Sequence, residues 1–139
     1  MLPKVELREF SRNDVASIAE WLKDAEIQES WFGRYTYGEP AHLGYEPEKM
    51  IDATEDEWSE VFHDPHHEPH RDIFSIYDAE GSHIGEAQLA IDEPLGDAQL
   101  SILIGRKELW HKGYGTATTI TLLDHIFNQL GLYRAWVDV

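Results

Sequence analysis

A chain of 139 residues is close to the commonest size of a single domain and is long enough to enclose one hydrophobic core. Its content of 42% hydrophobic and 12% aromatic residues excludes a mainly disordered protein, although 27 acidic against 11 basic residues give a formal net charge of -16. This acidity argues against nucleic acid as a direct partner, because binding phosphates needs a basic face. It suits a cationic partner, or it simply keeps the protein soluble.

The absence of cysteine excludes a disulfide framework and a thiol nucleophile. A mechanism in which both substrates are bound together is left open. No apolar run approaches membrane-spanning length, and the N-terminus lacks the apolar core of a signal peptide. We therefore expect a cytoplasmic protein with no membrane partner.

The chain begins with a predicted strand and helix. Alternating apolar residues from Val5 indicate a short strand, and Ser11 with Asp14 has the spacing of a helix cap. Apolar residues at helical spacing then predict a helix over residues 12–24. The following stretch, residues 30–45, is aromatic and interrupted by glycines, and it predicts no regular element.

The middle of the chain predicts a second helix, a loop and three strands. The helix covers residues 47–62, with a proline acceptable in its first turn. A proline-broken loop with four histidines follows at 63–72. Strands are expected at 73–78, 83–92 and 98–105, joined by turns that favour antiparallel pairing.

The last part predicts a helix and a final strand. Residues Ile120, Leu123, Phe127 and Leu130 form an apolar stripe along the helix, and Gly131 ends it. The final strand covers residues 133–139. The chain shows no internal repeat or linker, which predicts a single domain over residues 1–139.

The connection into that helix is the most informative segment. Gly113 and Gly115 at the helix mouth let the backbone approach a ligand closely, and the free amides of the first turn favour an anion. In a strongly acidic chain, this one connection gathers basic side chains: Arg106, Lys107, His111 and Lys112. The pattern predicts a phosphate site.

Two other glycine-rich phosphate loops fit less well. A P-loop needs a lysine after its second glycine, whereas Lys112 precedes Gly113, and that alternative fails. A dinucleotide fingerprint needs a third glycine and a shorter turn from the strand. Asp138 does lie where a ribose-binding acid would, so this alternative stays open, as does a glycine-bearing turn that only caps a core helix.

The segment Trp110-His111-Lys112-Gly113-Tyr114-Gly115 resembles the coenzyme A pyrophosphate loop of the GNAT N-acetyltransferases, with tryptophan where Gln or Arg is usual. An aromatic residue at this position makes the loop resemble that of the ribosomal-protein-alanine acetyltransferase branch. Glu29-Ser30-Trp31-Phe32-Gly33 resembles a substrate-side loop of the aminoglycoside 6'-N-acetyltransferases. The resemblance covers nearly the whole chain and implies an α+β fold with a mixed, mostly antiparallel central sheet flanked by helices.

The resemblance implies transfer of an acetyl group from acetyl-CoA to a primary amine by direct attack, with no metal required. The amine must lose a proton and the developing oxyanion must be neutralised. Asp138 is the first candidate for the proton acceptor and Glu86 the second. The implied cofactor-binding residues are Leu103, Ile104, Gly105, His111, Lys112, Gly113, Tyr114, Gly115 and Thr116. Trp31, Phe32 and Tyr35 are the candidates for a substrate-binding wall.

Members of that family continue beyond the strand at which this chain stops. The resemblance therefore implies that the C-terminal part of the fold is missing, either because the chain is truncated or because another subunit supplies it. An uncovered sheet edge on the Asp138 side would invite association, so we expect a homodimer or a strand-swapped assembly. The truncated chain alone is expected to be poorly active.

The acceptor amine stays open between a protein N-terminus and a small cationic amine. Two other functions remain. One is a non-catalytic module that binds acyl-CoA without turnover. The other is a metal-binding hydrolase that uses the histidine-rich loop 63–72, since histidines and carboxylates at this density can bind a divalent ion.

Overall fold

The computed structural model describes residues 2–30, 52, 70–92 and 94–136. The strands are β1 (Val5–Glu9), β2 (His70–Asp78), β3 (His83–Asp92), β4 (Asp97–Ile104) and β5 (Arg134–Trp136). The helices are α1 (Arg12–Trp21), α2 (Ala25–Ser30) and α5 (Tyr114–Asp124), with a 3-10 turn η1 (Lys107–Leu109) and a π-helical turn η2 (His125–Gln129).

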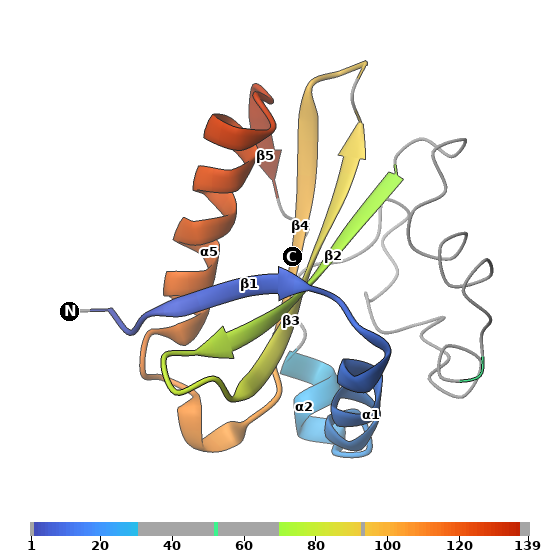
Figure 1. The fold of residues 1–139 in the computed structure, drawn as a ribbon, viewed down its shortest axis with the longest axis vertical. Coiled ribbons are helices and arrows are strands. Elements are labelled where there is room, and N and C mark those ends of the chain that lie inside the picture. Colours follow the sequence, from blue (N-terminus) through green and yellow to red (C-terminus); the bar gives the residue numbers. More distant parts are fainter. Residues whose placement is uncertain (1, 31–51, 53–69, 93, 137–139) are drawn as a thin grey trace.

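One five-stranded sheet forms the centre of the molecule, with its strands in chain order from β1 to β5 (Figure 1). The pairings from β1 to β4 are antiparallel, and β4 pairs with β5 in parallel. Helix α5 packs on one face, whereas α1 and α2 pack on the other. The expected mixed, mostly antiparallel sheet flanked by helices is confirmed.

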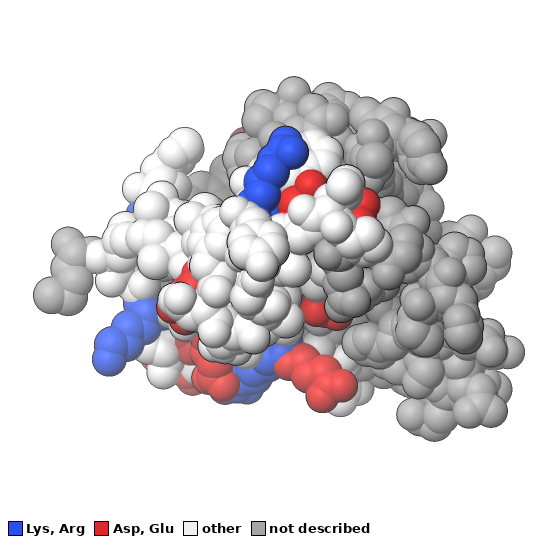
Figure 2. Space-filling view, turned by 90° about the horizontal axis from the view of Figure 1, so that it is seen from above, with Lys and Arg blue, Asp and Glu red and all other residues white. Residues whose placement is uncertain are grey.

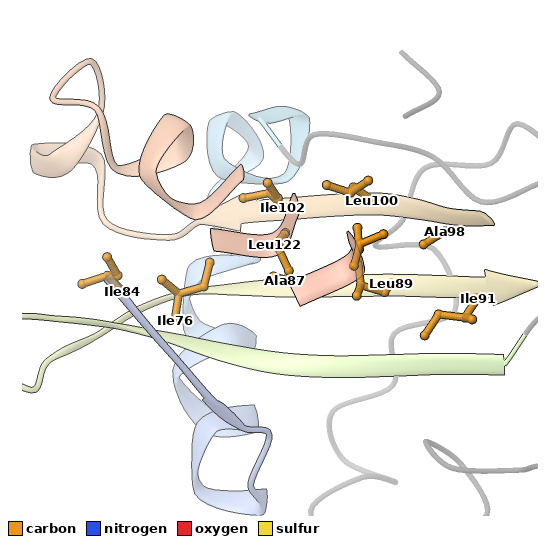
Figure 3. Packing of buried hydrophobic residues seen from close by; sticks show 10 residues of the cluster. Ile76, Ile84, Ala87, Leu89, Ile91, Ala98, Leu100, Ile102 and Leu122 are labelled. Carbon is orange, nitrogen blue, oxygen red and sulfur yellow. The ribbon is translucent and has the colours of Figure 1, made fainter. Parts of the chain in front are cut away.

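The α5 face of the sheet carries the larger apolar cluster. Side chains of β2, β3 and β4 converge there on Leu122 and Ile126, and Figure 3 shows Leu122 next to Ala87 within this cluster. Because side chains alternate along a strand, Ile102 of β4 belongs to this cluster while the adjacent Leu103 joins the cluster under α1. Strand β4 therefore contributes to both layers of the core.

Helix α1 is shorter than predicted. The capping box of Ser11 and Asp14 is present, but the helix ends at Trp21 rather than at residue 24. The amide of Asp24 bonds the Trp21 carbonyl at 3.1 Å in a tightened last turn, and its carboxylate accepts the Glu26 amide at 2.9 Å. Asp24 thus opens the next helix, α2, which the sequence did not indicate.

Strand β2 is longer than predicted, because it begins at His70 rather than at residue 73. Its first three residues continue the ladder with β3, where Asp72 faces Leu89. Backbone pairing needs no apolar side chains, so the polar composition concealed this part of the strand. Residues 31–45 of the irregular stretch lie outside the described residues, and so does the predicted helix at 47–62 apart from residue 52.

The predicted apolar stripe of α5 is wrong. Ile120 is 53% exposed, Phe127 42% and Leu130 38%. The buried face instead carries Ala117, Thr118, Leu122 and Ile126. Small residues let the helix approach the sheet, and the Thr118 hydroxyl is satisfied by the Tyr114 carbonyl at 2.8 Å. Gly131 does follow the end of the helical segment, with the positive φ of 68° that suits glycine.

A buried polar network joins α1 to the sheet. The Asp14 carboxylate accepts hydrogen bonds from Ser75 Oγ and Tyr77 Oη, each at 2.6 Å, and from Ser11 Oγ at 2.8 Å. Burial opposes its ionisation, but these bonds outweigh burial and hold the pKa of Asp14 below its usual value. Burial, together with the bond to Asp14, raises the pKa of Tyr77 to about 12.

No helix in the described ranges is long and apolar enough to cross a membrane.

Candidate functional site

The site begins where β4 ends and α5 starts. Between them the chain makes turn η1 and reaches Gly113, which caps α5 with a φ of 91°. The first hydrogen bond of the helix runs from the Ala117 amide to the Gly113 carbonyl at 2.9 Å. The amides of Tyr114, Gly115 and Thr116 precede that bond, so among the described residues they are the donors that a helix N-terminus leaves without an intrahelical partner.

A cavity of about 610 Å³ lies against this helix mouth, within the size range of small-molecule and cofactor sites. It is lined by Ser30, Ile102, Ile104, Leu109, Trp110, His111, Gly113, Tyr114, Gly115, Thr116 and Thr119. The lining brings the apolar side chains of β4 next to the amides of α5. The space can therefore receive a ligand with an anionic group at one end and an extended part along the strand.

Gly115 has open space where a side chain would begin. Outside its own helix backbone and chain neighbours, a Cβ atom built on Gly115 meets no described residue within 4 Å, whereas one on Gly113 comes within 3.0 Å of Leu2 and 3.2 Å of Pro3. Glycine therefore suits these two positions for different structural reasons. Gly113 is required by its backbone conformation and neighbours, and Gly115 leaves a wall of the cavity open.

Most of the predicted cofactor-binding residues meet at this cavity. Ile104, His111, Gly113, Tyr114, Gly115 and Thr116 all line it. Lys112 is exposed beside it, and the Leu103 side chain is fully buried in the α1 cluster. Gly105 directs its amide to the Ile84 carbonyl at 2.9 Å, and a Cβ there would overlap the Trp21 ring.

The predicted basic cluster is only partly available to an anion. Arg106 pairs with Glu108 at 2.7 Å, and Lys107 pairs with Asp24 at 2.7 Å and Glu26 at 3.0 Å. Hydrogen bonding by these two carboxylates raises the pKa of Lys107. Among the described residues, His111 and Lys112 form no such pair. His111 and Lys112 are therefore the two basic residues of this connection that the described ion pairs leave available, and binding of an anion by the cluster stays a prediction.

Trp110 is a site residue that sequence reasoning underestimated. Its indole Nε1 donates to the Ile104 carbonyl at 2.9 Å, and its ring packs against the cluster under α1. Trp110 stands in the sequence where related loops carry Gln or Arg. All three side chains carry an N–H donor, and this shared property was the signal that could have indicated a role for Trp110. The structure shows where the donor goes.

Glu86 is fully buried within β3 and accepts a hydrogen bond from Gln88 Nε2 at 3.1 Å. It lies directly opposite Leu103 in the antiparallel ladder, so its side chain shares the sheet face of α1 rather than that of α5. The strand residues Ile102 and Ile104 that line the cavity belong to the other face. Glu86 is thus not a solvated strand residue, and it does not line the described cavity.

The other predicted residues of the acceptor side, Trp31, Phe32, Tyr35 and Asp138, lie outside the described residues. The histidine-rich loop does so too, except for its last three residues, which belong to β2. Within the part of the chain that the structure describes, no group of three or more His, Cys, Asp or Glu could hold a metal ion.

Comparison with known proteins gives one family and a set of similar folds. A family model described as "Acetyltransferase (GNAT) domain" matches residues 4–139. A chimera of spermidine N-acetyltransferase SpeG from Vibrio cholerae and hSSAT has a TM-score of 0.66 at 22% identity, over 94% of this chain and 68% of that chain. The dodecameric structure of the Vibrio cholerae enzyme in an intermediate state gives 0.64 at 21% identity, over 94% and 67%. At this identity the likeness shows the fold. No curated protein sequence matches.

Proposed function

Because this chain belongs to the GNAT acetyltransferase domain family, we propose that it transfers an acetyl group from acetyl-CoA to a primary amine. The observation that carries the proposal is the cavity of about 610 Å³, in which the edge of β4 meets the glycine-bearing mouth of α5. Acetyl-CoA combines a pyrophosphate with an extended arm of amides, and the two walls of the cavity match these two parts. The open space at Gly115 supports this fit.

The amides of Tyr114, Gly115 and Thr116 would hold the pyrophosphate, with Lys112 and His111 adding nearby donors. The outward-facing backbone of β4 at Ile102 and Ile104 would hold the arm. Acetyl-CoA supplies an electrophilic thioester carbonyl. The protein must orient the amine toward that carbonyl and accept the proton that the amine loses.

Asp138 is the proposed proton acceptor, and Glu86 is the second candidate. The buried position of Glu86 suits a carboxylate that acts on groups at the α1 face of the sheet, directly or through water. Trp31, Phe32 and Tyr35 are the proposed wall for the acceptor. We propose a small cationic amine as the first acceptor to test, because the chain carries a formal charge of -16. A protein N-terminus is the second.

The binding half of this proposal is tested by Gly115→Leu. The added side chain should occupy the cavity wall and weaken acetyl-CoA binding at least about tenfold, or about 1.4 kcal/mol. The melting temperature should not fall, because a Cβ atom at this position meets no other described segment within 4 Å and leucine favours helix more than glycine does. Titration calorimetry and thermal unfolding measure the two effects.

Gly131→Asn is the matched control, because it changes a glycine of positive φ at the far end of the helical segment and should leave acetyl-CoA affinity unchanged. Equal affinity of wild type and Gly115→Leu would remove the pyrophosphate assignment. Thiol release with a panel of amines tests the transfer step. Tight binding without thiol release from any amine would indicate a non-catalytic acyl-CoA-binding module instead.

A further inference from the structure

The hydrogen bond from Trp110 to Ile104 lies at an unusual place in the sheet. Ile104 is the last residue of β4, and the indole that bonds its carbonyl reaches back from beyond turn η1. The Trp110 ring is held from one side by the core cluster under α1 and lines the cavity with the other. The donor is thus fixed by packing rather than left to a mobile surface side chain.

The backbone groups of β4 are not equally available to a ligand. Strand β3 pairs with all of β4, whereas in the described residues β5 pairs only with Asp97, Ala98 and Gln99. The amide of Gly105 points toward β3, where it bonds the Ile84 carbonyl. Since successive residues of a strand direct their backbone groups to opposite edges, those of Ile102 and Ile104 face the cavity edge.

A ligand that continues the parallel pairing of β5 along this edge has two registers near the helix mouth. In the first register, one ligand amide unit donates to the Ile102 carbonyl and accepts from the Ile104 amide. In the second, displaced by two residues or about 6.6 Å, it would use the Ile104 carbonyl and the Arg106 amide. Arg106 has extended backbone angles, φ -107° and ψ 107°, so its conformation alone does not exclude the second register.

We infer that Trp110 is a positioning residue that ends the usable edge of β4 by occupying the Ile104 carbonyl. Because the indole N–H already bonds the Ile104 carbonyl, a ligand can bind in the first register but not in the second. This inference rests on the proposed function, since the ligand with an extended amide arm is acetyl-CoA. The consequence is a fixed distance between the thioester, at one end of the arm, and the pyrophosphate at the mouth of α5.

The test replaces Trp110 alone by its benzothienyl analogue, which keeps the ring shape and lacks the N–H. Backbone amide exchange is followed by NMR with and without saturating acetyl-CoA. In wild type, acetyl-CoA should slow exchange of the Ile104 amide at least about tenfold and leave the Arg106 amide unchanged. In the analogue, protection should extend to the Arg106 amide. Where turnover is measured, kcat should fall about tenfold while the Kd of acetyl-CoA stays within about threefold.

The same analogue at Trp21 is the matched control, because that ring packs against the same core cluster outside the cavity lining. It should preserve the wild-type exchange pattern. Trp110→Phe gives a second variant without the donor and should follow the Trp110 analogue. Protection of the Arg106 amide in wild type, or an unchanged pattern in the Trp110 analogue, overturns the inference. Failure of wild type to bind acetyl-CoA at all would instead overturn the proposed function and this inference with it.

Discussion

Asp14 shows how one residue can have a local and a long-range role. Its position three residues after Ser11 predicted a helix cap, and the cap is present. The same carboxylate accepts hydrogen bonds from Ser75 and Tyr77 of β2, far along the chain. A local pattern cannot reveal such partners, because they come together only when the sheet forms.

Asp14→Asn should lower the free energy of unfolding by about 2 kcal/mol at neutral pH, since it removes a buried charged acceptor of several hydrogen bonds. The pKa of Asp14 is lowered in the folded state from 3.8, so its contribution is present above that value and is lost as the pH falls through the folded pKa. Urea unfolding should therefore show the two proteins converging in acid. Exposed Glu80→Gln is the control, and a difference that persisted unchanged in strong acid would contradict this account.

Helix α5 demonstrates a limit of periodicity at the scale of one element. Together with η2, its sequence contains two apolar stripes at helical spacing, and the stripe with Ile120 and Phe127 is the exposed one. Close packing of helix on sheet selects Ala117 and Thr118 instead. Turn η2 then changes the helical phase, since a π-turn contains an extra residue per turn.

Leu122→Ala should cost about 3 kcal/mol of stability, because Leu122 is fully buried between α5 and the sheet. Ile120→Ala, on the exposed stripe, should cost about 0.5 kcal/mol or less. Denaturant unfolding of both variants measures the contrast. Equal losses would mean that the Ile120 face is also covered in solution.

The strands, α5 and the two glycines of the loop were predictable, because hydrophobic alternation and glycine placement are local signals. Helix α2 was not predicted, because its six residues are too short to show apolar periodicity, although Asp24 before it is a local cap residue whose carboxylate accepts the Glu26 amide. The role of Trp110 was also hidden, because its partner is a backbone carbonyl at the end of β4. The pairing of Arg106 and Lys107 with carboxylates likewise required the folded arrangement.

At the scale of the whole molecule, the excess of acidic residues acts through the overall electrostatic potential rather than through single contacts. In the view of Figure 2, basic side chains on the described part of the surface lie beside acidic ones and form no basic face. With 27 acidic and 11 basic residues, the chain should attract a cationic acceptor and repel the anionic acetyl-CoA. If acetyl-CoA binds as proposed, the local donors at the helix mouth must overcome that repulsion.

Salt should therefore affect the two proposed substrates in opposite directions. Between about 0.05 M and about 0.5 M NaCl, kcat/KM for a polyamine should fall about fivefold, because salt screens the attraction between the acidic protein and the cationic amine. The KM for acetyl-CoA should stay constant or decrease. Steady-state kinetics measures both, with a monoamine as the control of weaker dependence. Equal salt dependence for polyamine and monoamine would count against steering by net charge.

The parallel pairing of β4 with β5 also affects the order in which the protein folds. The hairpins β2–β3 and β3–β4 close short turns, whereas β5 reaches β4 only after η1, α5 and η2 have crossed the sheet. Closing the longer loop costs more chain entropy, so β5 is expected to dock late. Since the same crossover forms one wall of the cavity, a folding intermediate that contained only the hairpins would have no place for a ligand.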